Sequence, residues 1–156
     1  MPELRVTGSC YYACSPVPAF RTSSEQATIA FGESFGRLLP RRHTVLLIGN
    51  LGAGKTTLAK GIVNGLGAAP PDEVSSPTFT LIHEYGNGRV YHVDLYRLEK
   101  LCEVATLGLD EIFEREAVVL LEWAERFPEI LPRERSEIRI RAVGDEEREI
   151  EVTELR

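Results

Sequence analysis

Two continuous apolar runs stand out in the pattern of hydrophobic and polar positions. Residues 44–48 (TVLLI) and 117–121 (AVVLL) contain no charged side chain, and both are bounded by polar or glycine residues. Strands that are buried on both faces, as in a parallel sheet, show such runs, whereas half-exposed strands alternate. We therefore expect both runs to be central strands of a mainly parallel sheet.

Helical periodicity surrounds these runs. Apolar residues recur at helical spacing across 27–38, and Thr22 with Glu25 fits a capping box in which Thr22 is the cap. A second helix is predicted for residues 56–66, where glycines end it, and a third for residues 100–114, broken near its glycine. Buried strands that alternate with helices indicate an α/β fold.

Alternating segments predict two antiparallel additions to the sheet. Residues 78–85 and 89–95 are expected to form strands joined by a turn at 86–88. Residues 137–143 and 148–152 alternate apolar and charged side chains, which is typical of a hairpin with one solvated face. The expected fold class is α/β, with a mainly parallel central sheet and antiparallel hairpin additions.

Composition fits one globular domain. The chain has 156 residues, 43% hydrophobic and 27% charged, so we expect a single domain over residues 22–156 behind a leader at residues 1–21. The net charge of −6 argues against stand-alone nucleic-acid binding. No signal-peptide pattern and no apolar run near the ~18 residues of a membrane span is present, and cysteines number only three. We expect a cytoplasmic protein without a membrane contact.

The stretch Gly49–Thr56 (GNLGAGKT) matches the phosphate-binding motif G-x-x-x-x-G-K-[ST] at every fixed position. It also lies between a predicted buried strand and a predicted helix, as this motif requires. Glycines let successive backbone N–H groups turn into one concavity, and the helix N-terminus adds a positive dipole end. We expect the Lys55 ammonium to face the β- and γ-phosphates of a nucleotide and the Thr56 hydroxyl to bind Mg²⁺.

Two carboxylates are candidates for the rest of the magnesium site. Glu122 directly follows the second apolar run, so it is expected at the carboxyl end of that strand, where α/β sheets bind ligands. Asp94 lies in an alternating segment, in which Val93 and Leu95 are expected on one face and Asp94 on the other with His92. P-loop enzymes place such a carboxylate beside the hydroxyl of the motif.

The base is expected to be adenine. GTPases recognise guanine through N-K-x-D, and no asparagine begins that pattern here; no D-x-x-G switch follows an aspartate either. A small-molecule kinase remains an alternative, because residues 99–116 have room for a short lid over a phosphoacceptor. A nucleotide-binding regulatory module without hydrolysis is a third possibility.

Further motifs make the sequence resemble the TsaE (YjeE) family of small bacterial ATPases. The resemblance covers about residues 22–153 and rests on the order and spacing of five motifs. These are Gly49–Thr57, Ser76-Pro77-Thr78-Phe79, Tyr91–Leu98 (YHVDLYRL), Leu107-Gly108 and Leu121-Glu122-Trp123. Many ATPases share the first motif, whereas H-x-D-x-Y-R and L-E-W together are far more specific.

The resemblance implies a three-layer P-loop NTPase fold and an ATPase that acts on the TsaB–TsaD protein pair. In this family that pair modifies adenosine 37 of tRNA to N6-threonylcarbamoyladenosine, and ATP hydrolysis resets the pair between turnovers. The chain would then meet tRNA only through its partners. Because no unambiguous arginine finger is present, with Arg97 the only arginine inside a family motif, hydrolysis is expected to be slow alone and stimulated by the partners.

Site residues follow from the same resemblance, position by position. It implies catalytic roles for Lys55, Asp94 and Glu122, and magnesium ligation by Thr56, Asp94 and Glu122. The segment Ser76–Phe79 resembles a switch-like loop near the γ-phosphate. The implied nucleotide contacts, with the first and last near the adenine, are Ser24, Gly49, Asn50, Leu51, Gly52, Ala53, Gly54, Lys55, Thr56, Thr57, Thr78 and Arg148.

Overall fold

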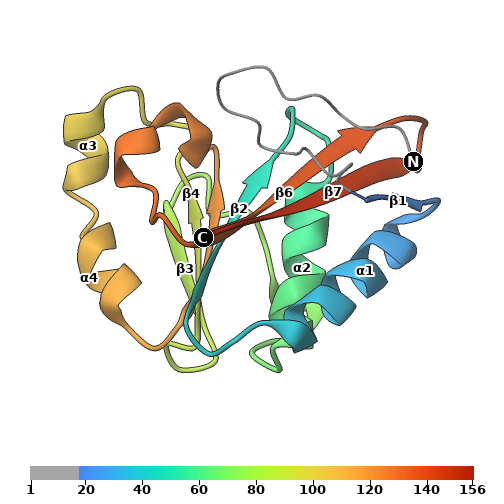
Figure 1. Cartoon of the computed structure of the whole chain (residues 1–156), viewed down its shortest axis with the longest axis horizontal. Helices are drawn as coiled ribbons and strands as arrows, with labels where there is room; N and C mark the ends of the chain where they lie inside the picture. The colour runs from blue at the N-terminus through green and yellow to red at the C-terminus, as the bar shows by residue number, and fades with distance from the viewer. Residues whose placement is uncertain (1–17) are drawn as a thin grey trace, which may run out of the picture.

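A seven-stranded sheet runs through the middle of the molecule, with helices on both faces (Figure 1). The structure, a computed structural model, describes residues 18–156; most of the predicted leader, with Cys10 and Cys14, lies outside this part. The strands are β1 (Ala19–Thr22), β2 (His43–Ile48), β3 (Ile82–Tyr85), β4 (Val90–Asp94), β5 (Val118–Glu122), β6 (Arg135–Ala142) and β7 (Arg148–Leu155). The α-helices are α1 (Glu25–Leu38), α2 (Lys55–Gly65), α3 (Leu101–Ala105) and α4 (Leu109–Glu114), and short 3₁₀ turns are η1 (Pro71–Glu73), η2 (Ala124–Arg126) and η3 (Pro128–Ile130).

The strand order places parallel strands at the centre and antiparallel strands at both edges. The order is β1-β7-β6-β2-β5-β4-β3, and β6, β2, β5 and β4 run parallel to one another. At one edge β7 and β1 are antiparallel additions, and at the other edge β3 is. The predicted fold class, both central strands and both hairpins are confirmed. The predicted leader boundary falls inside β1, so residues 19–21 belong to the sheet.

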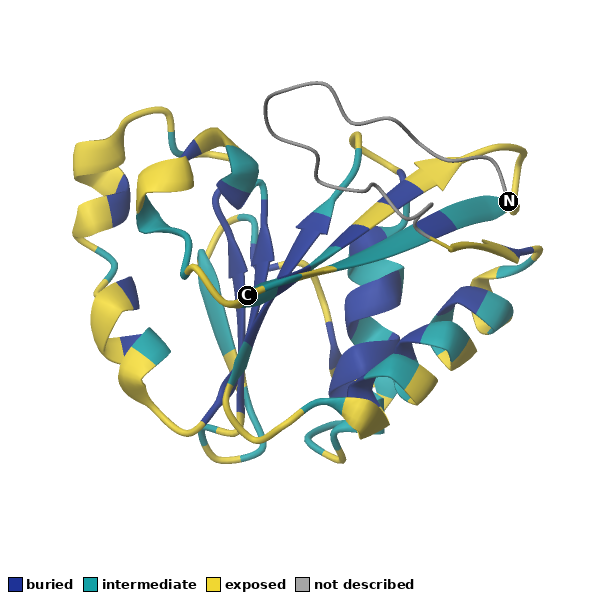
Figure 2. Ribbon diagram, in the orientation of Figure 1, coloured by how far each residue is buried: buried dark blue, intermediate teal, exposed yellow. Residues whose placement is uncertain are grey.

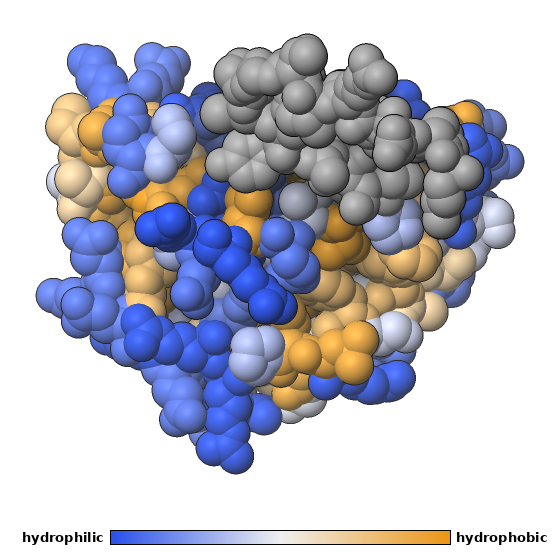
Figure 3. All heavy atoms as spheres, in the orientation of Figure 1, coloured by the Kyte–Doolittle hydropathy of each residue, from blue (hydrophilic) through white to orange (hydrophobic). Residues whose placement is uncertain are grey.

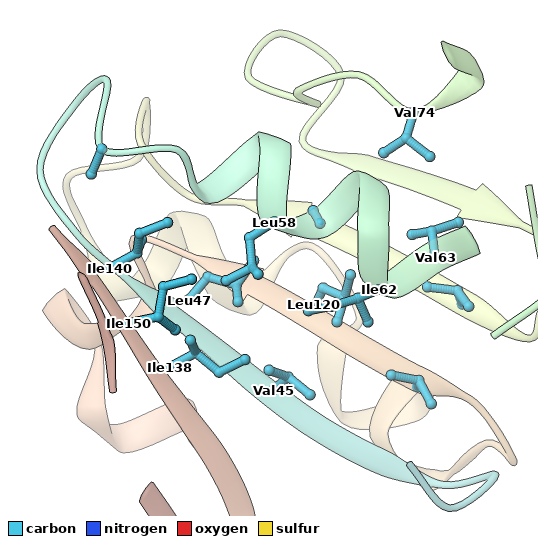
Figure 4. Close-up of a cluster of buried hydrophobic side chains, with 14 residues drawn as sticks. Val45, Leu47, Leu58, Ile62, Val63, Val74, Leu120, Ile138, Ile140 and Ile150 are labelled. Atoms are coloured by element: carbon cyan, nitrogen blue, oxygen red, sulfur yellow. The ribbon is translucent and has the colours of Figure 1, made fainter. Parts of the chain in front are cut away.

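The two faces of the sheet carry separate hydrophobic cores. On the face covered by α1 and α2, side chains such as Leu47, Leu120 and Ile138 form one cluster (Figure 4). On the face covered by α3, α4 and the 3₁₀ turns after β5, Leu46 and Leu121 belong to the other cluster. Alternate side chains of each central strand therefore enter opposite cores. This arrangement is why the two apolar runs are unbroken and why these strands are the most buried part of the ribbon (Figure 2).

Glycines let α1 and α2 approach each other closely. A Cβ at Gly61 would lie 2.1 Å from the carbonyl oxygen of Ile29, and one at Gly36 would lie 2.5 Å from that of Ile62. Larger residues at these positions would push the helices apart. The close packing of α1 holds α2 in position. The N-terminus of α2 follows the turn of the phosphate-binding motif Gly49–Thr56, called the P-loop below.

Two predictions at the ends of elements are wrong. Ser24 rather than Thr22 caps α1, because the Ser24 hydroxyl oxygen accepts the Ala27 N–H at 3.0 Å. The Thr22 hydroxyl instead bonds to that of Thr28 at 2.7 Å inside the domain. The strand predicted from residue 78 begins only at Ile82.

A turn replaces the first half of that predicted strand. The Leu81 N–H donates to the Pro77 carbonyl at 2.6 Å, and Leu81 has a φ of 69°. This left-handed conformation is uncommon for a branched residue, and it prevents residues 78–81 from continuing the ladder. The switch-like segment therefore lies in a loop beside the carboxyl end of β4.

The helices of residues 18–156 lack the combination of length and apolarity that a membrane span needs. The face seen in Figure 3 carries mainly hydrophilic side chains over α4 and the C-terminus, with an apolar patch near the C-terminal end of α1. Leu38, at that end of α1, is 85% exposed.

Candidate nucleotide-binding site

The P-loop follows β2 at the carboxyl edge of the sheet and leads directly into α2. Gly52 and Gly54 have φ values of 78° and 106°, in the left-handed region that favours glycine, and Gly54 is the N-cap of α2. A Cβ at Gly49 would lie 2.5 Å from the carbonyl oxygen of Ile140, so the loop also packs tightly on β6. The first N–H groups of a helix lack intrahelical partners, so this turn presents a ready anion site.

Lys55, the first residue of α2, folds back over the loop. Its ammonium donates to the carbonyl oxygens of Gly49 and, at 3.2 Å, Asn50. It also lies 3.9 Å from the centre of the Trp123 ring, in cation–π contact. Lys55 is only 5% exposed, and this burial lowers the pKa of its ammonium, although nearby carboxylates oppose the shift.

Thr56 and Glu122 meet beside the loop. The Thr56 hydroxyl donates to Oε1 of Glu122 at 3.4 Å, and Nε2 of His92 lies 2.8 Å from the same oxygen. Glu122 ends β5 and is 2% exposed, while His92 in the adjacent β4 is fully buried. Three elements distant in sequence, α2, β5 and β4, therefore meet at one carboxylate.

Asp94 ends β4 directly beside Glu122 in the strand register. Its Oδ2 accepts the hydroxyls of Ser76 at 3.1 Å and Thr78 at 3.0 Å, and its Oδ1 accepts the Tyr96 N–H at 2.9 Å. Asp94 is 2% exposed. This carboxylate therefore ties the switch-like segment to the loop that follows β4.

Aromatic side chains border the site. Trp123 has a φ of 64°, unusual for a residue other than glycine, and its ring centre lies 5.1 Å from that of Tyr96. Phe79 is 82% exposed, and the Arg97 guanidinium lies 5.2 Å from the centre of its ring. Arg97 therefore contacts the switch-like segment.

A cavity of about 230 Å³ joins the predicted phosphate and magnesium residues. It is lined by Leu51, Gly52, Ala53, Gly54, Lys55, Thr56, Ser76, Thr78, Asp94, Tyr96, Glu122 and Trp123. Lys55 is the single cation among these described lining residues. The predicted residues Gly49 and Asn50 instead line a neighbouring cavity of about 620 Å³ between the P-loop and β6, which Leu51, Gly52 and Ala53 also border.

Of the two residues predicted to lie near the adenine, Arg148 lines another cavity, of about 270 Å³. Its lining residues are Glu25, Thr28, Thr57, Asp145, Glu146 and Arg148. Arg148 also approaches the P-loop, because its Nε lies 3.5 Å from the position of a Cβ at Gly54. Ser24 does not line the cavity; it caps the helix whose first turn does.

The oxygen donors suit Mg²⁺ bound together with nucleotide phosphates. Within residues 18–156, no three His, Cys, Asp or Glu side chains form a group that would hold a metal ion by themselves. Mg²⁺ is usually held by one or two carboxylates, waters and substrate phosphates rather than by a complete protein cage. The Thr56 hydroxyl with Glu122 and Asp94 supplies that smaller set of hard oxygen ligands.

Four residues join the site beyond the predicted catalytic, metal and nucleotide residues: His92, Ser76, Tyr96 and Trp123. His92 was placed with Asp94 by strand alternation, but its contact with Glu122 depends on the pairing of β4 with β5. Ser76 belongs to the switch-like motif, and only the turn that replaces the predicted strand brings it to Asp94. No sequence signal indicates that Trp123 packs on Lys55.

Comparisons with known proteins agree with the family resemblance. The family described as threonylcarbamoyl adenosine biosynthesis protein TsaE matches residues 22–150. The tRNA threonylcarbamoyladenosine biosynthesis protein TsaE of Bacillus subtilis is 44% identical over 136 residues, covering 86% of this chain and 84% of the relative. The protein of the same name from Treponema pallidum is 41% identical over 130 residues, covering 83% of this chain and 95% of the relative.

A solved structure supports the same relationship. The crystal structure of Bacillus subtilis YdiB matches with a TM-score of 0.72 at 38% identity, and the match covers 89% of this chain and 86% of that one. The resemblance inferred from the motifs is thereby confirmed, and the comparisons give no support to the small-molecule kinase. The chain belongs to the TsaE family of threonylcarbamoyl adenosine biosynthesis proteins.

Proposed function

We propose that the chain is a Mg²⁺-dependent ATPase that supports N6-threonylcarbamoyladenosine synthesis at position 37 of tRNA, by acting on the TsaB–TsaD pair in the cytoplasm. The observation that carries the proposal is the convergence of Lys55, Thr56, Asp94 and Glu122 around one cavity. The absence of a guanine motif favours ATP, and the net charge of −6 favours contact with tRNA through partners.

Lys55 is proposed to exchange loop carbonyls for phosphate oxygens. Its ammonium now donates to the carbonyl oxygens of Gly49 and Asn50. Anionic phosphate oxygens are stronger acceptors than carbonyls, and a buried site screens the attraction less than water does. The ammonium would therefore leave these carbonyls and the Trp123 ring when the β- and γ-phosphates enter the loop.

Thr56, Glu122 and Asp94 are proposed to hold Mg²⁺, with the carboxylates binding directly or through water. The metal would neutralise negative charge on the phosphate oxygens as the terminal phosphate leaves. The hydrogen bond from Thr56 to Glu122 places hydroxyl and carboxylate side by side, as such a ligand pair requires. Glu122 is also proposed to orient the attacking water, because it lies in the cavity between the P-loop and Asp94.

The adenosine is proposed to occupy the cavity between α1 and the turn joining β6 to β7. Thr57 links this cavity to the phosphate end, because it follows Thr56 on α2 and lines the cavity itself. A planar guanidinium such as that of Arg148 stacks well on a flat base. Ser24 would act by capping α1 and fixing the turn that carries Glu25.

Slow basal hydrolysis is proposed from the places of the arginines within residues 18–156. No arginine lines the phosphate cavity among the described residues, and Arg97 packs on Phe79. An arginine delivered in trans can supply ~10³–10⁵ in rate. We propose that TsaB–TsaD docks beside the nucleotide, orders the Ser76–Phe79 segment and stimulates hydrolysis.

The direct test is ATP hydrolysis at saturating ATP and Mg²⁺, with and without purified TsaB–TsaD. The expected result is a slow basal rate that rises when the pair is added and vanishes when Mg²⁺ is chelated. Equal rates with and without the pair, where binding is shown independently, would refute partner stimulation. No hydrolysis under either condition would refute the ATPase assignment.

A further inference from the structure

His92 and Glu122 form a buried pair at the edge of the nucleotide site. Their side chains are 0% and 3% exposed, and His92 Nε2 lies 2.8 Å from Glu122 Oε1. The other ring nitrogen, Nδ1, has no hydrogen-bond partner among the described residues. A buried nitrogen without a partner carries a desolvation cost, which an apolar side chain of similar size would avoid. Packing alone therefore gives no reason for a histidine at this position.

The missing partner of Nδ1 indicates which nitrogen carries the proton. A neutral imidazole has one N–H donor and one bare acceptor nitrogen. A proton on Nδ1 would be a buried donor with no acceptor, whereas a proton on Nε2 has the Glu122 carboxylate as acceptor. His92 is therefore assigned, from its partners, as the Nε2–H tautomer that donates to Glu122.

We propose that His92 is a positioning residue for Glu122 in Mg²⁺-dependent catalysis; this inference rests on the proposed function. Oε1 accepts from His92 on its buried side and from Thr56 on the side of the P-loop. Two donors on one oxygen fix the carboxylate, and no described residue binds the other oxygen, which is left for the metal or the attacking water. A hydroxyl can donate its proton and still offer a lone pair, so both contacts persist when Thr56 binds Mg²⁺.

A pair of variants separates a hydrogen-bonding role from simple filling of the core. The amide nitrogen in His92→Gln lies near the position of Nε2 and can still donate to Glu122. His92→Asn has its amide nitrogen near Nδ1, too short to reach the carboxylate. His83→Gln is the matched control, because His83 lies opposite His92 in the strand register and contacts Tyr85 rather than Glu122.

The readouts are the Mg²⁺ concentration for half-maximal nucleotide binding, measured by calorimetry, and kcat. Loss of a residue that orients a metal ligand typically costs about 10–100-fold in metal affinity or activity. We expect that loss in His92→Asn, with nucleotide affinity in the absence of Mg²⁺ unchanged. His92→Gln and His83→Gln are expected to stay within about threefold of the wild type, well inside that range.

Other outcomes of these measurements would overturn the positioning role of His92. Equal loss in His92→Gln and His92→Asn, or no loss in a folded His92→Asn, would overturn the positioning role. If neither variant folds, nitrogen NMR of the wild-type imidazoles decides, with Nε2–H and a bare Nδ1 expected for His92 and a protonated Nδ1 overturning the assignment. A wild type without Mg²⁺-dependent nucleotide binding would contradict the proposed function instead, while the NMR result would still stand or fall by itself.

Discussion

Two groups of charged residues on the same sheet differ in burial. At the carboxyl edge, Lys55, Asp94 and Glu122 are 5%, 2% and 2% exposed and lie around one cavity. On β6 and β7, Glu149 pairs with Arg141 at 2.5 Å, and the side chains of the carboxylate and the arginine are 16% and 70% exposed. Both groups contain a cation and carboxylates near one another, so residue type alone does not distinguish them.

The difference in burial indicates which charges do not contribute to the stability of the fold. Burying a charge is costly unless partners compensate it, whereas exposed ion pairs cost little and contribute little. The exposed pair lies on the β6–β7 hairpin, where the Arg141 side chain is largely open to solvent. The buried group retains charges that the hydrophobic core does not need. This indicates that the group binds a charged ligand.

The largest expected effect is on nucleotide binding when the buried cation is removed. Lys55→Met keeps the length of the side chain but loses the ammonium. We expect ATP affinity to fall at least about 100-fold, the size of one or two hydrogen bonds to charged groups. Calorimetry measures this, with Lys60→Met on the same helix as the control. Wild-type ATP affinity in Lys55→Met would refute the phosphate assignment.

The same variant is expected to keep or raise the free energy of unfolding. Burial lowers the pKa of Lys55 in the folded protein, so the unfolded chain binds more protons as the pH approaches the ordinary lysine pKa. Wild-type stability should therefore rise with pH above the lowered pKa, and Lys55→Met should lack that rise. Thermal melts across alkaline pH compare the two.

The next effect separates binding from chemistry. Glu122→Gln keeps the shape of the side chain but removes the charge proposed for metal and water. At saturating Mg²⁺ we expect partner-stimulated hydrolysis to fall about 100-fold or more, a typical loss for a residue that acts on the attacking water, with ATP affinity near that of the wild type. The Mg²⁺ concentration for half-maximal nucleotide binding should rise, because a proposed metal ligand has lost its charge. Glu149→Gln is the matched change in the less buried pair and should hydrolyse normally. Equal hydrolysis rates in both variants would contradict the proposed catalytic role of Glu122.

A smaller effect is expected at the neighbouring carboxylate. Asp94 accepts three hydrogen bonds, including those of Ser76 and Thr78. An amide in Asp94→Asn cannot accept all three, so we expect stability to fall by about 1–3 kcal/mol. Hydrogen exchange should also quicken in residues 76–81. Unchanged exchange there would show that Asp94 does not anchor the segment.

The smallest effect is expected in the exposed pair. The Arg141 guanidinium, with Arg21, lowers the pKa of Glu149 in the folded protein. Such a carboxylate stabilises the fold at pH values above its ordinary pKa of about 4. This stabilisation is lost as the pH falls through the lowered pKa of the folded protein. In Glu149→Gln the melting temperature should therefore fall slightly less steeply at acid pH, and stability at neutral pH should be nearly unchanged. A large loss at neutral pH would contradict the contrast between the two groups.

Features held within a short stretch of sequence were predictable. The P-loop is one continuous motif, and the unbroken apolar runs report strands with a core on each face. Local pattern predicts Glu122 at a strand end and Asp94 on the polar face of its strand, and parallel strands bring their carboxyl ends to one edge. These patterns together place the P-loop, Glu122 and Asp94 at the same edge of the sheet.

Features that depend on neighbours from elsewhere in the chain were not predictable. Thr22 looked like a cap, but the pairing of β1 with β7 and its bond to Thr28 place it in the sheet and leave Ser24 as the cap. The contact of His92 with Glu122 requires the register of β4 and β5. The burial of Lys55 requires a tryptophan far along the chain to pack over it.

The position of bound Mg²⁺ tests the central claim most directly. A crystal structure with Mg²⁺ and a non-hydrolysable ATP analogue would locate the metal relative to the buried group. We expect the Thr56 hydroxyl oxygen as a direct ligand at about 2.0–2.1 Å, with at least one of Glu122 and Asp94 bound directly or through one water. A metal away from Thr56, or with both carboxylates beyond the reach of a bridging water, would contradict the proposed site.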